Sequence, residues 1–283
     1  MMRTALVFAL ALVAGSAAAD DLTGLSTGFD DPAVLGEWSE HAPEGFTPKW
    51  QAPRIQEGML VLEPISGGWF EELHGGHLYR EVDGDFIVTT RIRVTGTDAE
   101  VPQTLFSLAG LFVRAPNTFS AASWAPGREN WLFFSIGTSA PAGTPQFEIK
   151  TTTNSLSTLK IRSAPTGWVE LRLARHAELF TLLHRAEGES EWTIADQMIR
   201  PDLPRLLNVG LTAYADWGSV QPIYPDMMRV NTKGTPENNA DLIAYVDRID
   251  FRRPAVGRIP IANIDAPAFI DAIEVRRTDL LSN

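Results

Sequence analysis

Hydrophobic and polar residues alternate with a period of two along much of this chain. In the clearest run, Val169, Leu171 and Leu173 fall on one face of an extended segment. Glu170 and Arg172, which lie between them, fall on the other face. This alternation is typical of a strand that packs one side against a core and turns the other toward water, as in an antiparallel sheet.

Similar short segments, rich in β-branched and aromatic residues, recur along the chain between turns. They are residues 58–63, 85–94, 109–114, 130–136, 146–151, 159–161, 179–184, 208–214 and 242–247. About a dozen strands, with turns every 8–12 residues, predict a sandwich or a barrel of antiparallel sheets. Long helical periodicity is absent from the sequence before the C-terminal tail. The sequence therefore predicts an all-β fold.

The N-terminal segment departs from this pattern. Residues 1–19 open with a basic start, continue through an apolar run from Ala5 to Ala14 and close in small residues. These features predict a signal peptide cleaved after Ala19, and hence a secreted or periplasmic protein. The apolar run is shorter than the ~20 residues that cross a bilayer, so we expect no membrane span.

We expect one β-sandwich over residues 20–253, followed by an extension over residues 254–283. Within the extension, residues 269–277 repeat the order of residue types found in residues 245–253. The repeat favours an extra strand. A short helix over residues 266–281 is the structural alternative, and the repeat could also arise by chance.

Composition and charge narrow the class of protein and its partners. The chain is 44% hydrophobic and 21% charged, which is typical of a folded domain rather than a disordered one. Its formal net charge of −11 argues against nucleic acid as a partner. Because the chain has no cysteine, an exported form would depend on its core, with or without a metal, rather than on disulfides. The sequence leaves the oligomeric state open.

Two blocks of sequence resemble a known family. The first, Leu78–Phe86, reads LYREVDGDF, and the second, Ala109–Arg114, reads AGLFVR. With a Gly-rich loop after Trp69 and the segment Glu129–Trp131, they make residues 28–253 similar to the concanavalin A-like lectin/glucanase superfamily. Within it, the chain resembles bacterial regulation-of-enolase-like jelly-roll domains.

The resemblance implies a sandwich of two curved antiparallel sheets. In related proteins the concave sheet often binds glycans, and a calcium ion often ties the N-terminal segment to the last strand. Many members have no known enzymatic activity. Each of these properties is an expectation for this chain.

Asp30 and Asp247 are the expected calcium ligands. Strand alternation puts Asp247 in phase with Tyr245, Ile249 and Phe251, which we expect to face the core. A buried carboxylate is costly unless it is hydrogen-bonded or bound to a cation, and calcium prefers such oxygen ligands. Asp30 lies near the mature N-terminus, where the resemblance implies a calcium contact. The alternative is an Asp247 side chain that accepts hydrogen bonds from backbone amides.

A second candidate site gathers aromatic and polar residues on one face of a sheet. Sugars bind to flat apolar rings together with groups that hydrogen-bond to their hydroxyls. The resemblance places Arg114, Trp131, Glu148 and Trp217 on neighbouring segments, and Trp69 and His77 lie in or beside the Gly-rich loop. With Glu129, these residues are the predicted glycan-binding set. In the alternative interpretation the tryptophans pack in the core, and Arg114 and Glu148 pair with each other.

Other chemistry is less well supported by the sequence. Glu129 and Glu148 are the carboxylate pair to test for glycoside hydrolysis, which needs two acids facing a substrate. Asp83–Gly84 is better explained as a hairpin turn than as part of a catalytic strand. His74 and His77 lie on the Gly-rich loop, where we expect solvated side chains rather than zinc or copper ligands.

We therefore expect an exported, non-catalytic, carbohydrate-binding β-sandwich protein whose partner is a glycan. One alternative is a glycoside hydrolase of the same fold that uses paired carboxylates. The other is a structural or protein-interaction module that uses the C-terminal extension as a contact strand.

Overall fold

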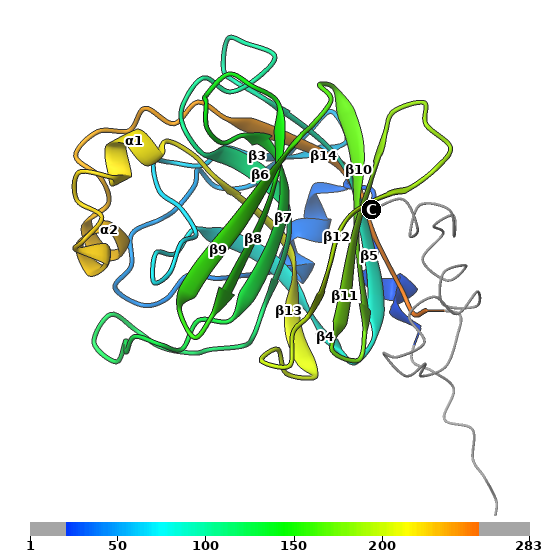
Figure 1. The fold of residues 1–283 in the computed structure, drawn as a ribbon, viewed down its shortest axis with the longest axis horizontal. Helices are drawn as coiled ribbons and strands as arrows, with labels where there is room; N and C mark the ends of the chain where they lie inside the picture. The colour runs from blue at the N-terminus through cyan, green and yellow to red at the C-terminus, as the bar shows by residue number, and fades with distance from the viewer. Residues whose placement is uncertain (1–20, 255–283) are drawn as a thin grey trace, which may run out of the picture.

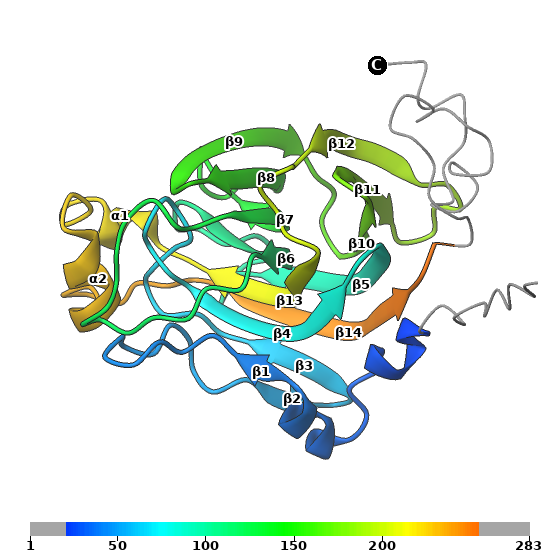
Figure 2. The same ribbon diagram turned by 90° about the horizontal axis from the view of Figure 1, so that it is seen from below.

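The computed structural model describes residues 21–254, which form two curved antiparallel sheets of seven strands each (Figures 1 and 2). We call the first the front sheet. Its strands lie in the order β1 (Ser39–Glu40), β4 (Gly76–Asp83), β13 (Leu206–Tyr214), β6 (Ser107–Arg114), β7 (Trp131–Thr138), β8 (Gln146–Thr153) and β9 (Leu156–Ser163).

The second sheet is called the back sheet. Its strands lie in the order β12 (Thr193–Ile199), β11 (Leu179–Ala186), β10 (Trp168–His176), β5 (Phe86–Thr95), β14 (Ile243–Arg252), β3 (Met59–Leu62) and β2 (Arg54–Gln56). Two short α-helices, α1 (Trp217–Val220) and α2 (Met227–Lys233), follow β13. Two 3₁₀-helices, Leu22–Leu25 and Pro32–Glu37, precede β1. The predicted all-β sandwich is confirmed.

The hydrophobic core lies between the two sheets. Front-sheet residues such as Leu132 and Phe134 belong to the same buried cluster as back-sheet residues Val169, Leu171 and Leu173. As predicted from the alternation in β10, its aliphatic side chains face the core. Each such side chain stabilises the fold by roughly 1.5–3 kcal/mol when it leaves water.

A second apolar layer covers the outer face of the front sheet. Trp69, from the loop before β4, packs on Phe112 of β6 and on Trp131 of β7, with ring centroids 4.5 and 5.9 Å away. Near α1 and α2, Leu73 and Val230 form a further buried cluster. The front sheet is therefore buried on both faces over much of its area.

All ten segments predicted as strands coincide with strands, and four further strands were missed. The sequence suggested a Gly-rich loop where β4 begins, and the short edge strands β1 and β2 had no signal. β12 was missed because consecutive polar residues, Asp196 and Gln197, interrupt its alternation. The predicted signal peptide and almost all of the predicted extension lie outside the described residues.

Within residues 21–254, no helix is long and apolar enough to cross a membrane.

Close packing of the front sheet gives a first test. A Cβ added at Gly210, in the middle of β13, would overlap the Leu78 carbonyl oxygen and lie 2.8 Å from the Tyr79 Cα atom. We expect Gly210→Ala to lower the free energy of unfolding by about 1–3 kcal/mol, measured by urea denaturation, because the neighbouring strand must move. Gly24→Ala is the matched control, since nothing lies within 4 Å of its Cβ position. Equal stability of the two variants would contradict this packing.

Candidate functional site

An open groove of about 560 Å³ lies at one end of the outer face of the front sheet. Tyr79 and Glu81 of β4, Asn208 of β13 and Arg114 of β6 line its floor. These residues are neighbours because Asn208 lies opposite Glu81 on one side and opposite Arg114 on the other. The register of the three strands therefore brings these side chains together on the groove floor.

Two loops, residues 40–44 and 116–123, form the walls of the groove. They meet at one end, where the Ala121 backbone N–H donates to the Glu44 carbonyl oxygen at 2.8 Å. Phe119 comes from the second wall, and its ring lies 6.0 Å from the ring of His41 in the first wall. The groove thus combines aromatic rings with polar side chains, as sugar sites do.

Arg114 is held in place by a buried ion pair. Its Nε and Nη2 atoms donate to the two carboxylate oxygens of Glu129 at 2.8 and 2.7 Å. The Arg114 and Glu129 side chains are only 1% and 2% exposed. Asn117 adds a third hydrogen bond to Glu129, at 3.1 Å. The arginine therefore contributes a rigid, already neutralised group to the groove.

Arg114 is the only one of the seven predicted glycan-binding residues that lines this groove. Trp69 and Trp131 are fully buried in the second apolar layer beneath the loops. Neither indole can stack on a sugar from solvent in this conformation. The expectation that these rings line an open groove therefore fails, because loops fill the space above them.

Glu148 belongs to a buried polar cluster on the same face. Its Oε1 atom lies 2.8 Å from the Lys150 ammonium and accepts a hydrogen bond from the Tyr214 hydroxyl at 2.8 Å. Burial lowers the pKa of Lys150, and burial with the Glu148 carboxylate raises the pKa of Tyr214 well above its ordinary value. Glu148 thus pairs with Lys150, and Arg114 pairs with Glu129, in place of the Arg114–Glu148 pair considered from sequence.

Three histidines lie at the edge of this layer, of which His74 and His77 are buried and His41 is partly buried. The His41 Nε2 and His74 Nδ1 atoms lie 3.1 Å apart, and the two rings stack. His77 is fully buried, and neither of its ring nitrogens has a hydrogen-bond partner among the described residues. Burial, with the positive charge of Arg114 nearby, holds the pKa of all three imidazoles well below the ordinary value. The expectation of solvated side chains at His74 and His77 is therefore wrong.

Trp217 lies away from the groove. It opens α1, just beyond the C-terminal end of β13, whereas Asn208 lies near the start of that strand. Six strand residues separate Asn208 from Tyr214, a distance of roughly 20 Å at the usual rise. Trp217 packs against Phe70 and Tyr224, with ring centroids 5.8 and 5.2 Å away. Its predicted role alongside Arg114 would require a ligand that spans the whole sheet.

The groove residues that were not singled out from sequence are His41, Tyr79, Glu81, Phe119 and Asn208. Tyr79 and Glu81 stand in the block LYREVDGDF that carried the resemblance, two residues apart. Had β4 been recognised as a strand, their shared face with His77 would have followed from alternation. The loop residues had no such signal, because their position depends on the packing of the walls.

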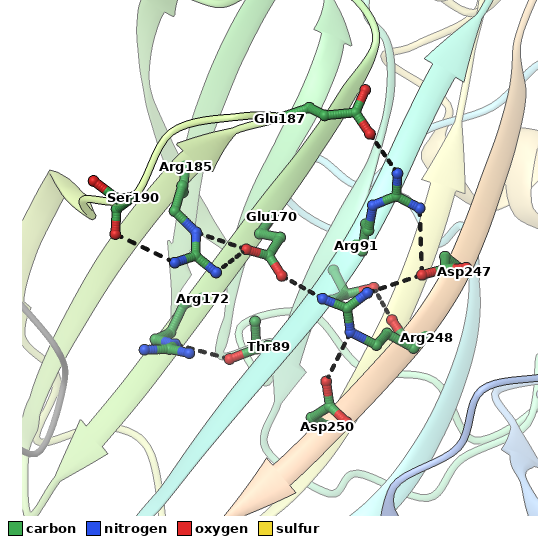
Figure 3. Close-up of polar contacts among 11 residues, drawn as sticks. Thr89, Arg91, Glu170, Arg172, Arg185, Glu187, Ser190, Asp247, Arg248 and Asp250 are labelled. Carbon is green, nitrogen blue, oxygen red and sulfur yellow. Dashed lines mark hydrogen bonds and ion pairs between the residues drawn. The ribbon is translucent and has the colours of Figure 1, made fainter.

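Asp247 does not face the core, in contrast to the sequence prediction. A β-bulge between Val246 and Arg248 changes the phase of β14, and the Asp247 side chain is 36% exposed on the back sheet. It lies 2.9 Å from Arg248 and 3.4 Å from Arg91 (Figure 3). Its charge is thus balanced by two arginines.

Asp30, the other predicted calcium ligand, is exposed. Among residues 21–254, no group of three or more histidine, aspartate or glutamate side chains is placed to hold a metal ion. A structural calcium at Asp30 and Asp247 stays a prediction, without the buried carboxylate on which it was based.

The outer face of the back sheet carries a network of ion pairs (Figure 3). Glu170 of β10 lies at its centre, between Arg248 at 2.5 Å and Arg185, whose Nε donates at 2.7 Å. Arg91 pairs with Glu187 at 2.6 Å. In this network each carboxylate contacts at least one guanidinium group.

No protein-family model matches the chain, and no curated protein matches its sequence. Solved structures do share its fold. A functionally unknown protein from Saccharomyces cerevisiae aligns over 79% of this chain and 99% of its own, with a TM-score of 0.52 and 16% identity. The GH43 protein BlXynB from Bacillus licheniformis aligns over 81% of this chain and 39% of its own, with a TM-score of 0.53 and 12% identity.

A xylan β-1,4-xylosidase from Bacillus halodurans gives the same coverage, 81% and 39%, with a TM-score of 0.52 and 16% identity. This chain thus spans well under half the length of the two Bacillus proteins. At these identities the likeness concerns the fold alone, and the predicted all-β sandwich of two curved antiparallel sheets is confirmed.

Because the pKa values of these three histidines are lowered in the folded chain, we expect the stability of the fold to depend on pH. The unfolded chain takes up protons on histidine near pH 6.5, whereas the folded chain keeps His41, His74 and His77 neutral to lower pH. We expect the melting temperature to fall as the pH is lowered below about 6.5 toward 5. His77→Phe removes one such group without breaking a hydrogen bond, so the melting temperature of this variant should fall less steeply as the pH is lowered. Parallel profiles for His77→Phe and the parent would contradict this.

The Arg114–Glu129 pair predicts a large effect on stability. We expect Arg114→Met to lower the free energy of unfolding by about 3–5 kcal/mol, because the Glu129 carboxylate is left buried without its partner. Chemical denaturation measures this value. Arg205→Met is the control, since the Arg205–Asp83 pair is largely exposed and should matter far less. A similar loss of unfolding free energy in the two variants would contradict the larger contribution expected of the buried pair.

Proposed function

We propose that this protein is an exported, non-catalytic, carbohydrate-binding β-sandwich protein that holds a glycan in the groove at Tyr79, Glu81 and Asn208. The observation that carries the proposal is the groove itself. It is open on a sheet face whose neighbouring part is sealed by aromatic side chains and loops. It offers partly exposed rings at Tyr79 and Phe119 next to carboxylate and amide groups.

The polar groups of the groove are suited to a polyhydroxylated ligand. Asn208 is 5% exposed, and its Oδ1 atom has no hydrogen-bond partner among the described residues. Glu81 is exposed, and its carboxylate makes no hydrogen bond or ion pair with the described residues. A sugar hydroxyl that donates to either group would make a bond that the protein alone does not make.

The burial of the other carboxylates supports binding rather than hydrolysis. A glycoside hydrolase needs two acids that reach the scissile bond. Glu129 and Glu148, the pair considered from sequence, are 2% and 0% exposed and are bound to Arg114 and Lys150. A hydrolytic function would require the loops above them to open.

Two further observations agree with the proposal. The segment Met1–Ala19 has the features of a signal peptide, which supports export. Two of the proteins similar in fold are a GH43 protein and a xylan β-1,4-xylosidase, which supports a carbohydrate ligand. Under this proposal, Trp69, His77, Trp131 and Glu148 form the packed base beneath the binding face.

Binding to a panel of xylo-, cello-, laminari- and chito-oligosaccharides tests the function. Calorimetric titration should find at least one binder. Tyr79→Ala and Asn208→Ala should each weaken it by about three- to ten-fold, from the loss of one ring contact or one hydrogen bond. Tyr245→Ala is the matched control, because Tyr245 lies on β14 of the back sheet.

Three results would overturn the proposal. The first is the absence of binding to every oligosaccharide of the panel by a folded protein. The second is binding that Tyr79→Ala and Tyr245→Ala reduce equally. The third is release of reducing ends that Glu148→Gln abolishes, which would favour the hydrolase.

A further inference from the structure

The charge of the groove points to the class of glycan it would take. Three glutamates, Glu40, Glu44 and Glu81, are exposed and line the groove. The positive charge of Arg114 is cancelled by Glu129 at 2.7 Å. Counting Glu40, Glu44 and Glu81 as −1 each and the Arg114–Glu129 pair as zero gives the groove a net charge of −3.

These carboxylates are not neutralised within the protein. Among residues 21–254, Glu44 and Glu81 make no ion pair, and their carboxylates accept no hydrogen bond. Glu40 accepts one hydrogen bond, from the Trp50 indole at 2.8 Å, which carries no charge. The back-sheet carboxylates Glu170 and Asp247, by contrast, each contact an arginine. Carboxylates without an ion pair on one wall and on the floor of the same groove repel each other and attract a cation.

A second observation on the groove floor is independent of charge. Asn208 is more than nine-tenths buried, and its Oδ1 acceptor has no partner in the described part of the chain. A buried polar atom without a partner costs free energy until a donor reaches it. The buried Asn208 oxygen and the Glu44 and Glu81 carboxylates are therefore acceptors without a donor, and they call for a ligand that donates.

We propose that the groove binds a glycan whose sugars carry protonated amino groups, such as an oligomer of glucosamine, and that it rejects glycans built from uronic acids. This inference rests on the proposed function and names its ligand class. An ammonium group supplies the positive charge that the groove lacks, together with N–H donors for the Asn208 oxygen and the glutamate carboxylates. The sugar rings supply apolar faces for Tyr79 and Phe119.

The test compares two ligands that differ only at nitrogen. Hexamers of glucosamine and of N-acetylglucosamine are titrated in mildly acidic buffer, where the free amines carry protons. We expect the glucosamine hexamer to bind more tightly and to lose affinity as salt is added, because exposed charges are screened. An oligogalacturonate should not bind.

Variants then locate the effect. Glu44→Gln and Glu81→Gln should each weaken binding of the glucosamine hexamer by about two- to five-fold, the usual range for an exposed ion pair, and weaken binding of the N-acetylated hexamer less, because glutamine keeps an oxygen that accepts a hydrogen bond. Glu100→Gln is the matched control, because Glu100 is exposed in the loop between β5 and β6 and does not line the groove.

The possible results separate this inference from the proposed function. Equal binding of the two hexamers, weakened by Asn208→Ala but not by Glu81→Gln, would overturn the amino-sugar inference and keep glycan binding. Binding of oligolysine as tight as that of the glucosamine hexamer would also overturn it, because the groove would then recognise charge without sugar. Failure of every oligosaccharide to bind a folded protein would overturn both proposals.

Discussion

The central strands of the front sheet are buried on both faces, and this constraint decides where a ligand can reach the protein. β6 and β7 have no exposed residue, although only one side of each packs against the back sheet. On the other side, Phe112 and Trp131 pack beneath Trp69 and its loop. Aromatic side chains bury large apolar areas, so this layer contributes strongly to the stability of the fold. The face that could have been a long open cleft is thereby reduced to one groove at its end.

Burial also decides which charged groups are free to act. A charge removed from water must be paired, and the covered part of the face follows this rule. Glu129 holds Arg114 with two hydrogen bonds, and Glu148 lies between Lys150 and Tyr214. These groups are committed to one another, so they contribute to rigidity. Chemistry with a ligand is left to groups at the open end, where water and a partner can enter.

The sequence allowed the sandwich to be predicted because most strands carry their own signal, either alternation as in β10 or a run of β-branched and aromatic residues. It did not allow β12 to be predicted, since that strand depends on pairing with β11 rather than on its own pattern. Arg114 was correctly placed on the face of a sheet by resemblance. The openness of that face could not be predicted, because the cover comes from loops. One clue was present: apolar runs such as Trp131–Phe134 are typical of strands buried on both faces.

The phase of Asp247 shows why strand alternation alone is a weak guide to buried charge. One bulged residue in β14 was enough to move this carboxylate from the expected core position to the back-sheet network. There, arginines and carboxylates contact one another along the strands, so their charges largely cancel (Figure 3). The groove on the front sheet differs, since Glu44 and Glu81 make no ion pair with any residue from 21 to 254. Carboxylates that make no ion pair with the described residues, gathered around a buried amide oxygen without a partner, therefore mark the groove as the place where a donor from outside completes the structure.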